Sequence, residues 1–191
     1  MKNLIILAAI VFGIYYYSTH SGATAVANEI EFDGKDVIFH DEVFATNWTS
    51  KTKTVTGYVR EINQENMSIM PIVTYSIVAT TGDYSNPDKV EIKHVRHGYQ
   101  LLSKQAAGKP KGSIIIYHLI PLDAEVQKKI ESIKIGDNFS IKARISQSGK
   151  LKSPRAVYQL SSYEPSEYMR AKMEKVDNAA YQLILLVESI N

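Results

Sequence analysis

The stretch from Ser113 to Ile145, SIIIYHLIPLDAEVQKKIESIKIGDNFSIKARI, decides the fold. It begins with an apolar run that Pro121 ends, which is typical of a buried strand. Asp123 then stands where the N-cap of an amphipathic helix over residues 124–133 is expected. From residue 138 to residue 147 apolar and polar side chains alternate, so a second strand follows, with one dry face and one basic face.

Patterns typical of strands recur along the rest of the body, at residues 37–39, 53–62, 69–80, 90–95, 99–102 and 156–160. The last of these is expected to pair with the strand that ends at residue 147. The final apolar run, 181–190, fits either a helix or a strand. Five or more strands with a helix before the Gly-Asp strand predict a mainly β (α+β) fold. We expect a small OB-like β-barrel, an oligomer-binding type with a helix between its third and fourth strands, and one or two short helices in all.

The N-terminus has the composition of a membrane-inserting segment. Lys2 precedes an uninterrupted apolar stretch over residues 4–17, which ends in three tyrosines of the kind found at membrane interfaces. The stretch is shorter than the about 20 residues of a typical spanning helix, and it is also compatible with a signal-peptide core. The positive-inside rule places everything after it outside the cytoplasm. We expect a single-pass inner-membrane protein with its domain on the periplasmic or extracytoplasmic side, or, alternatively, secretion to the periplasm after cleavage near Ala27.

The chain therefore divides into three parts. Residues 1–20 form a membrane anchor or signal segment, residues 21–28 are small and polar like a flexible spacer, and residues 29–191 form one β-barrel-like domain. The length of the last part fits the about 100–200 residues of a single domain.

Composition excludes several kinds of chemistry. The chain has no cysteine, which rules out disulfides, thiolate zinc sites, iron–sulfur clusters and thiol nucleophiles. A net charge of +2 is too small to indicate a polyanionic partner by itself. We expect neither a cofactor nor a bound metal.

Lysines and arginines outnumber acidic residues between positions 128 and 155, and they form the candidate partner-binding surface. Its members are Lys142, Arg144, Lys150, Lys152, Arg155 and Tyr158. Cations mixed with an aromatic ring are typical of proteins that bind single-stranded nucleic acid. Export makes lipid headgroups, a cell-wall polymer or an acidic protein surface the better match. A solvated surface without a partner is the alternative.

The histidines form no pattern that predicts catalysis. His94 and His97 are three positions apart in a strand-and-turn region, where such positions point to opposite faces. His118, at the end of a strand, is expected to be a hydrogen-bonded structural residue. Ser113, His118 and Asp123 could be written as a triad, but no nucleophile elbow surrounds the serine. We therefore expect no enzyme.

The deciding stretch and the C-terminus together resemble a group of uncharacterised bacterial envelope proteins with an N-terminal membrane anchor. The shared motifs are an H-[LI]-I-P strand end, a strand that follows Gly-Asp, and a closing strand that ends in Glu-Ser-Ile. They are represented here by His118, Leu119, Ile120, Pro121, Gly136, Asp137 and residues 187–190. The resemblance implies an outside-facing domain, a barrel-like body and a last segment that is a strand, and it carries no activity.

These observations predict a membrane-tethered binding or assembly module of the bacterial cell envelope without catalysis. It would contact the membrane through residues 4–17, and its partner would be an envelope protein or an anionic envelope polymer. The alternative is a nucleic-acid-binding OB-like barrel, which export disfavours, and a hydrolase comes third.

Overall fold

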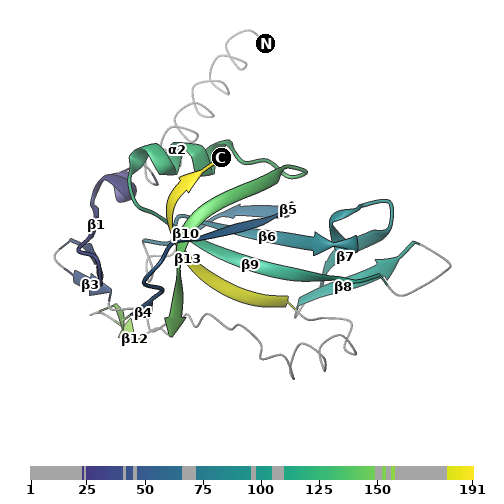
Figure 1. Ribbon diagram of the computed structural model, residues 1–191, viewed down its shortest axis with the longest axis horizontal. Coiled ribbons are helices and arrows are strands. Elements are labelled where there is room, and N and C mark those ends of the chain that lie inside the picture. The colour runs from purple at the N-terminus through teal and green to yellow at the C-terminus, as the bar shows by residue number, and fades with distance from the viewer. Residues whose placement is uncertain are drawn as a thin grey trace, which may run out of the picture.

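The computed structural model describes residues 23, 25–40, 42–44, 47–65, 72–95, 98–104, 110–148, 152–153, 156–157 and 180–191. The protein is mainly β, with few helices, and a closed barrel of five strands forms its centre (Figure 1). The barrel strands are β5 (Lys53–Gln64), β6 (Tyr75–Gly82), β9 (Gly112–Pro121), β10 (Asn138–Ser148) and β13 (Ala180–Ile190). The predicted mainly β barrel is confirmed, and this architecture is compatible with an OB-like barrel.

Strand order explains how the barrel closes. The strands follow the order β13-β9-β6-β5-β10, and a further pairing of β13 with β10 completes the circle. The pair β13 and β9 is parallel, with Ile184 opposite His118, whereas the other four pairs are antiparallel. A short strand, β4 (Asn47–Trp48), continues along β10 beyond the closed part.

The helix α2 (Ala124–Ser132) lies across one end of the barrel, between its third strand, β9, and its fourth, β10 (Figure 1). Its predicted N-cap is confirmed, since the amide of Val126 donates to Asp123 Oδ1 at 2.8 Å. Val126 and Ile130 are buried against the barrel interior. The strand, helix and strand predicted from residues 113–147 are therefore all present.

Alternating side chains of every barrel strand fill the interior. From β9 and β13 these are Ile115, Tyr117, Leu119, Leu183, Leu185 and Val187. The predicted dry face of β10, with Phe139, Ile141 and Ala143, belongs to the same core. Because successive side chains of a strand point to opposite faces, the residues between them lie on the outside of the barrel.

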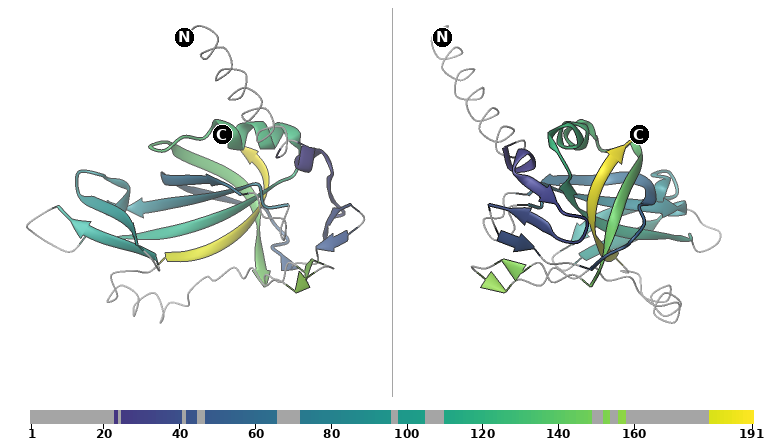
Figure 2. Two further views of the ribbon diagram at one scale, coloured as in Figure 1. Left: turned by 180° about the vertical axis from the view of Figure 1, so that it is seen from behind. Right: turned by 60° about the vertical axis from the view of Figure 1, so that its left-hand side comes forward.

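A second apolar core lies outside the barrel. A three-stranded sheet of β1 (Ile30–Phe32), β2 (Val37–Phe39) and β3 (Glu42–Phe44) packs there, as Figure 2 shows. It covers the outward-facing Ile120 of β9 and Ile184 and Leu186 of β13. These exterior positions are apolar because they are covered, which explains the uninterrupted apolar runs of both strands.

A hairpin of β7 (Val90–Val95) and β8 (Gly98–Ser103) follows the short helix η1 (Asp83–Ser85), as the two strand patterns predicted. A small third cluster with Val78 and Ile114 at its centre includes Tyr84 and Ile92 from this insertion. The hairpin extends away from the end of the barrel that carries α2 (Figure 1).

Two expectations about individual strands differ from the structure. Residues 156–157 form β12 (Ala156–Val157), which pairs with β11 (Lys152–Ser153) and not with β10. At Ser146 and Ser148, β10 pairs with β4. The strand expected over residues 69–80 is β6 from Tyr75 onward, whereas residues 72–74 are not in a strand and residues 69–71 lie outside the described part of the chain. β5 has an irregularity in its pairing with β6 between Val59 and Glu61.

The final apolar run is a strand, β13, as the resemblance implied. β13 pairs with β9 on one side and with β10 on the other, and only a strand can make both pairings. The expected anchor over residues 1–20 lies outside the described part of the chain. Within the described residues no helix has the length and apolar character needed to cross a membrane. Residues 25–28 of the expected spacer are helical, and Ala27 is 1% exposed.

Candidate functional site

Two members of the predicted basic surface lie together on the outer face of β10. Lys142 is exposed, Arg144 is half-buried, and the side chains between and beside them, Ile141 and Ala143, point into the barrel. Lys150, Arg155 and Tyr158 lie outside the described residues. Lys152 belongs to β11, and its side chain is not described. The structure therefore confirms that side chains of β10 alternate between the barrel interior and its outer face. That the predicted basic residues form one surface stays a prediction.

Arg144 is held by its neighbours. Its Nε donates to Glu188 Oε1 at 2.8 Å, and its Nη1 donates to the carbonyl of Ser50 at 3.0 Å. The guanidinium also lies 5.4 Å from the ring centroid of Phe32, on β1. These contacts join two barrel strands to the outer sheet, so Arg144 stabilises the packing of the barrel. Its positive charge is already paired with Glu188.

The structure places three polar side chains next to one another across the barrel exterior. They are Ser76 of β6, His118 of β9 and Gln182 of β13, and we call them the polar stripe. Ser76 Oγ lies 2.8 Å from His118 Nδ1, and His118 Nε2 lies 3.3 Å from Gln182 Oε1. Ser76 is 4% exposed and His118 9%, whereas Gln182 is exposed.

Burial lowers the pKa of His118 below its usual 6.5, although the hydrogen bond to Gln182 and the charge of Glu65 oppose this shift. The imidazole is therefore neutral near pH 7. Since the amide oxygen of Gln182 can only accept, Nε2 carries the hydrogen, and Nδ1 accepts from the hydroxyl of Ser76. The stripe is a directed chain of hydrogen bonds that ends at the exposed amide of Gln182.

Ser76, His118 and Gln182 follow one another in the order of a nucleophile, a base and an orienting group. However, Ser76 lies within a central strand and is almost completely buried, so a substrate has no access to its hydroxyl in this structure. The triad written from the sequence is not formed. Ser113 and His118 are five residues apart on β9, or about 17 Å along a strand, and Asp123 caps α2.

Another polar group on the exterior is Arg60, at the bulge of β5. Its guanidinium lies 4.9 Å from the ring centroid of Tyr58 and donates to the carbonyl of Tyr84. Burial lowers the pKa of Arg60. The Nε of Arg60 is buried without a hydrogen-bond partner. Arg60 thus links the barrel to the β7–β8 insertion.

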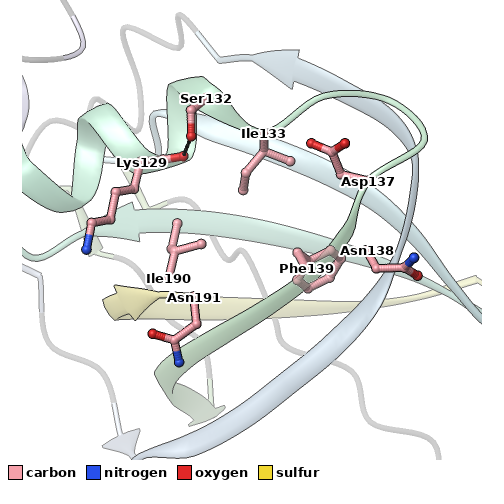
Figure 3. Close-up of a pocket in the computed structure, with 8 residues that line it drawn as sticks. All are labelled: Lys129, Ser132, Ile133, Asp137, Asn138, Phe139, Ile190 and Asn191. Carbon is pink, nitrogen blue, oxygen red and sulfur yellow. Dashed lines mark hydrogen bonds between the residues drawn. The ribbon is translucent and has the colours of Figure 1, made fainter.

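A pocket of about 330 Å³ opens at the end of the barrel beside α2 (Figure 3). Ile133, Phe139 and Ile190 form its apolar floor, and Lys129 and Asn191 stand at its rim. The remaining lining residues are Ser132, Asp137 and Asn138. The pocket thus combines an apolar base with one cation and several polar groups.

The motif residues do not converge on one site. His118 belongs to the polar stripe, and Pro121 ends β9 opposite Val187. Gly136 adopts a φ of 97°, which favours glycine, and Asp137 Oδ2 accepts from the amide of Lys134 at 2.8 Å. Gly136 and Asp137 therefore shape the turn before β10.

Histidine, aspartate and glutamate side chains form no group suited to a metal ion in the part of the chain that the structure describes. The side chain of His94 and all of His97 lie outside that part. The expectation of a metal-free protein stays a prediction.

The polar stripe was not predicted, although the sequence carries a signal for it. Ser76 and His118 are polar residues whose immediate neighbours in the sequence are apolar or aromatic, within strands rich in apolar side chains. A polar side chain in a buried strand needs a hydrogen-bond partner. Identifying that partner required the order of the strands in space.

Comparison with known protein families, with curated proteins and with solved structures finds no match to this chain.

Proposed function

We propose that this chain is a membrane-tethered binding or assembly module of the bacterial cell envelope, built on an OB-like barrel and without catalytic activity. Support for the OB-like type comes from the strand order, the parallel pair of third and fifth barrel strands, and the helix between the third and fourth. Barrels of this type bind oligomeric ligands on the face of their second and third strands. Those strands correspond to β6 and β9 here.

The polar stripe is the observation that carries the proposal. It lies on the outer face of β6 and β9, and it extends to β13. Apolar positions flank it on both sides and are covered, by the outer sheet at Ile120 and by the hairpin region at Ile114. Ser76 and His118 are buried, so a partner would meet the stripe at the exposed amide of Gln182. An exposed amide that is held in place by two buried polar residues suits a polar partner, such as an envelope protein segment or an envelope polymer.

Charge favours a partner of this kind over nucleic acid. Arg144 is paired with Glu188, and Glu65 acts electrostatically on His118 at the stripe. A negative charge near the stripe repels phosphates. Lys142 is exposed and could serve an anionic polymer at a separate place on β10.

The chain has no cysteine, so single cysteines can carry a photoreactive crosslinker without competition. We would compare Q182C in the stripe, K142C on β10 and V43C on the outer sheet, each in the full chain in its native membrane. Val43 is exposed and serves as the control. The proposal expects one defined adduct from Q182C and none from V43C.

Two results would change this account. An adduct from K142C alone would move the partner to the basic face of β10. Equal, diffuse labelling from all three positions would contradict a specific binding surface on the barrel.

A further inference from the structure

We propose that the end of the barrel that carries α2 rests on the lipid surface, with Ile135 inserted among the headgroups. This inference rests on the proposed membrane tether. It adds an orientation for the domain and a contact that the tether alone does not require.

The path of the chain gives the orientation. Ala23 is 7% exposed and belongs to the barrel core, and Ala27 is 1% exposed. Residues 25–28 lie beside α2 in all three views of Figures 1 and 2. The polypeptide that precedes residue 23 therefore joins the domain at the α2 end of the barrel.

Chain length limits the distance to the membrane. The apolar stretch of the sequence ends at Tyr17, and the six peptide steps from there to Ala23 span at most about 22 Å. The ten residues of β9 extend about 33 Å along the strand, which is about 25 Å along the barrel axis at the usual strand tilt of about 40°. A spacer of that length cannot hold the far end of the barrel at the membrane while Ala23 stays packed beside α2.

Ile135 supplies the contact. It is 65% exposed, in the turn between α2 and β10, whereas Ile133 two positions earlier is buried. Among the described residues, the other exposed large apolar side chain is Val43, which belongs to the outer sheet. An isoleucine at the tip of a turn on the membrane side suits insertion into the interface.

Charges at this end are mixed. Lys128 and Lys134 are exposed, but Glu125 lies 4.0 Å from Lys129, and Asp137 is also exposed. Lipid charge therefore contributes little, and the contact depends on apolar insertion. The pocket beside the turn adds the apolar side chains of Ile133, Phe139 and Ile190 to this end of the barrel (Figure 3).

The experiment places an environment-sensitive fluorophore at I135C or, as the matched control, at V43C, in the full chain reconstituted into phosphatidylcholine vesicles. Both positions are exposed, so neither label disturbs the core. Nitroxide-labelled lipids then quench the fluorophore according to its depth. The proposal expects at least severalfold stronger quenching at position 135 than at position 43, with the same ratio when anionic lipid is added.

Flotation of the vesicles separates this inference from the tether. Equal quenching at the two positions in protein that floats with the vesicles would overturn the lipid contact and leave the tether intact. Protein that does not float would overturn both.

Discussion

Lys142 and Arg144 stand two positions apart on the same face of β10, yet their charges have different roles. Lys142 points into solvent, whereas the guanidinium of Arg144 binds Glu188, the carbonyl of Ser50 and the ring of Phe32. Substitution of each residue alone therefore separates a surface charge from a structural ion pair.

We expect R144E to lower the free energy of unfolding by about 2 kcal/mol, because it loses charge-assisted hydrogen bonds and places two carboxylates together. K142E, the matched control, should change stability by less than about 0.5 kcal/mol. Urea denaturation measures both. Recovery of stability in the charge-reversed double variant R144E/E188R would attribute the loss to the pair, and equal effects of the two single variants would contradict the assignment.

His118 makes stability depend on pH. Its pKa is lowered in the folded state by burial, so the unfolded chain binds a proton first as the pH falls. Stability is therefore unaffected above the unfolded pKa of about 6.5 and decreases below it, before most carboxylates titrate at about pH 4. We expect H118N, whose amide oxygen can still accept from Ser76, to lose this dependence.

Urea midpoints at pH 7.5 and pH 5.5 test this expectation. The wild-type protein should lose more stability between the two values than H118N does. Parallel behaviour of the two proteins would show that His118 is not a buried neutral group.

At the scale of elements, Gly57 shows how closely β5 packs against its two neighbours, β6 and β10. A Cβ at this position would lie 3.1 Å from Ala79 Cβ and 3.1 Å from the Phe139 ring. We expect G57A to cost about 1–3 kcal/mol through overpacking, with T56A on the exposed side of β5 as the control. Thermal unfolding of both variants measures the difference, and an equally stable G57A would mean that the ring of Phe139 can move aside.

Elements whose signals are local could be predicted from the sequence. In β9, α2 and β10, residue type, capping and periodicity agree, so each segment indicates one structure. β13 was ambiguous because it is apolar on both faces, a pattern that also suits a helix. β12 pairs with β11, a strand of two residues that carries no strand pattern in the sequence, so this pairing could not be predicted.

The same distinction holds for the candidate site. Alternation placed Lys142 and Arg144 on the outer face of β10, but Glu188, which pairs with Arg144, is 44 residues away. The polar stripe combines three strands whose order no local pattern contains. Its binding role stays a proposal.

At the scale of the whole molecule, the folded unit includes more than the barrel. Residues 23–44 contribute Ala23 to the barrel core and Val37 and Phe44 to the second core. We expect a chain that begins at residue 23 to unfold in one cooperative thermal transition. Removal through residue 44 should lower its stability severely, because it exposes Ile120, Ile184 and Leu186, each worth about 1.5–3 kcal/mol when buried. Equal melting of the two truncated chains would contradict this role of the outer sheet.

The central claim is that the barrel is held at a membrane and faces away from the cytoplasm. Fusion of alkaline phosphatase, which is active only after export, to Asn191 of the full chain tests this claim most directly. Lys2, the apolar stretch that follows it and the positive-inside rule predict strong phosphatase activity in the membrane fraction. An inactive phosphatase fusion, together with bright fluorescence from a matched fusion to a cytoplasm-only fluorescent protein, would contradict it.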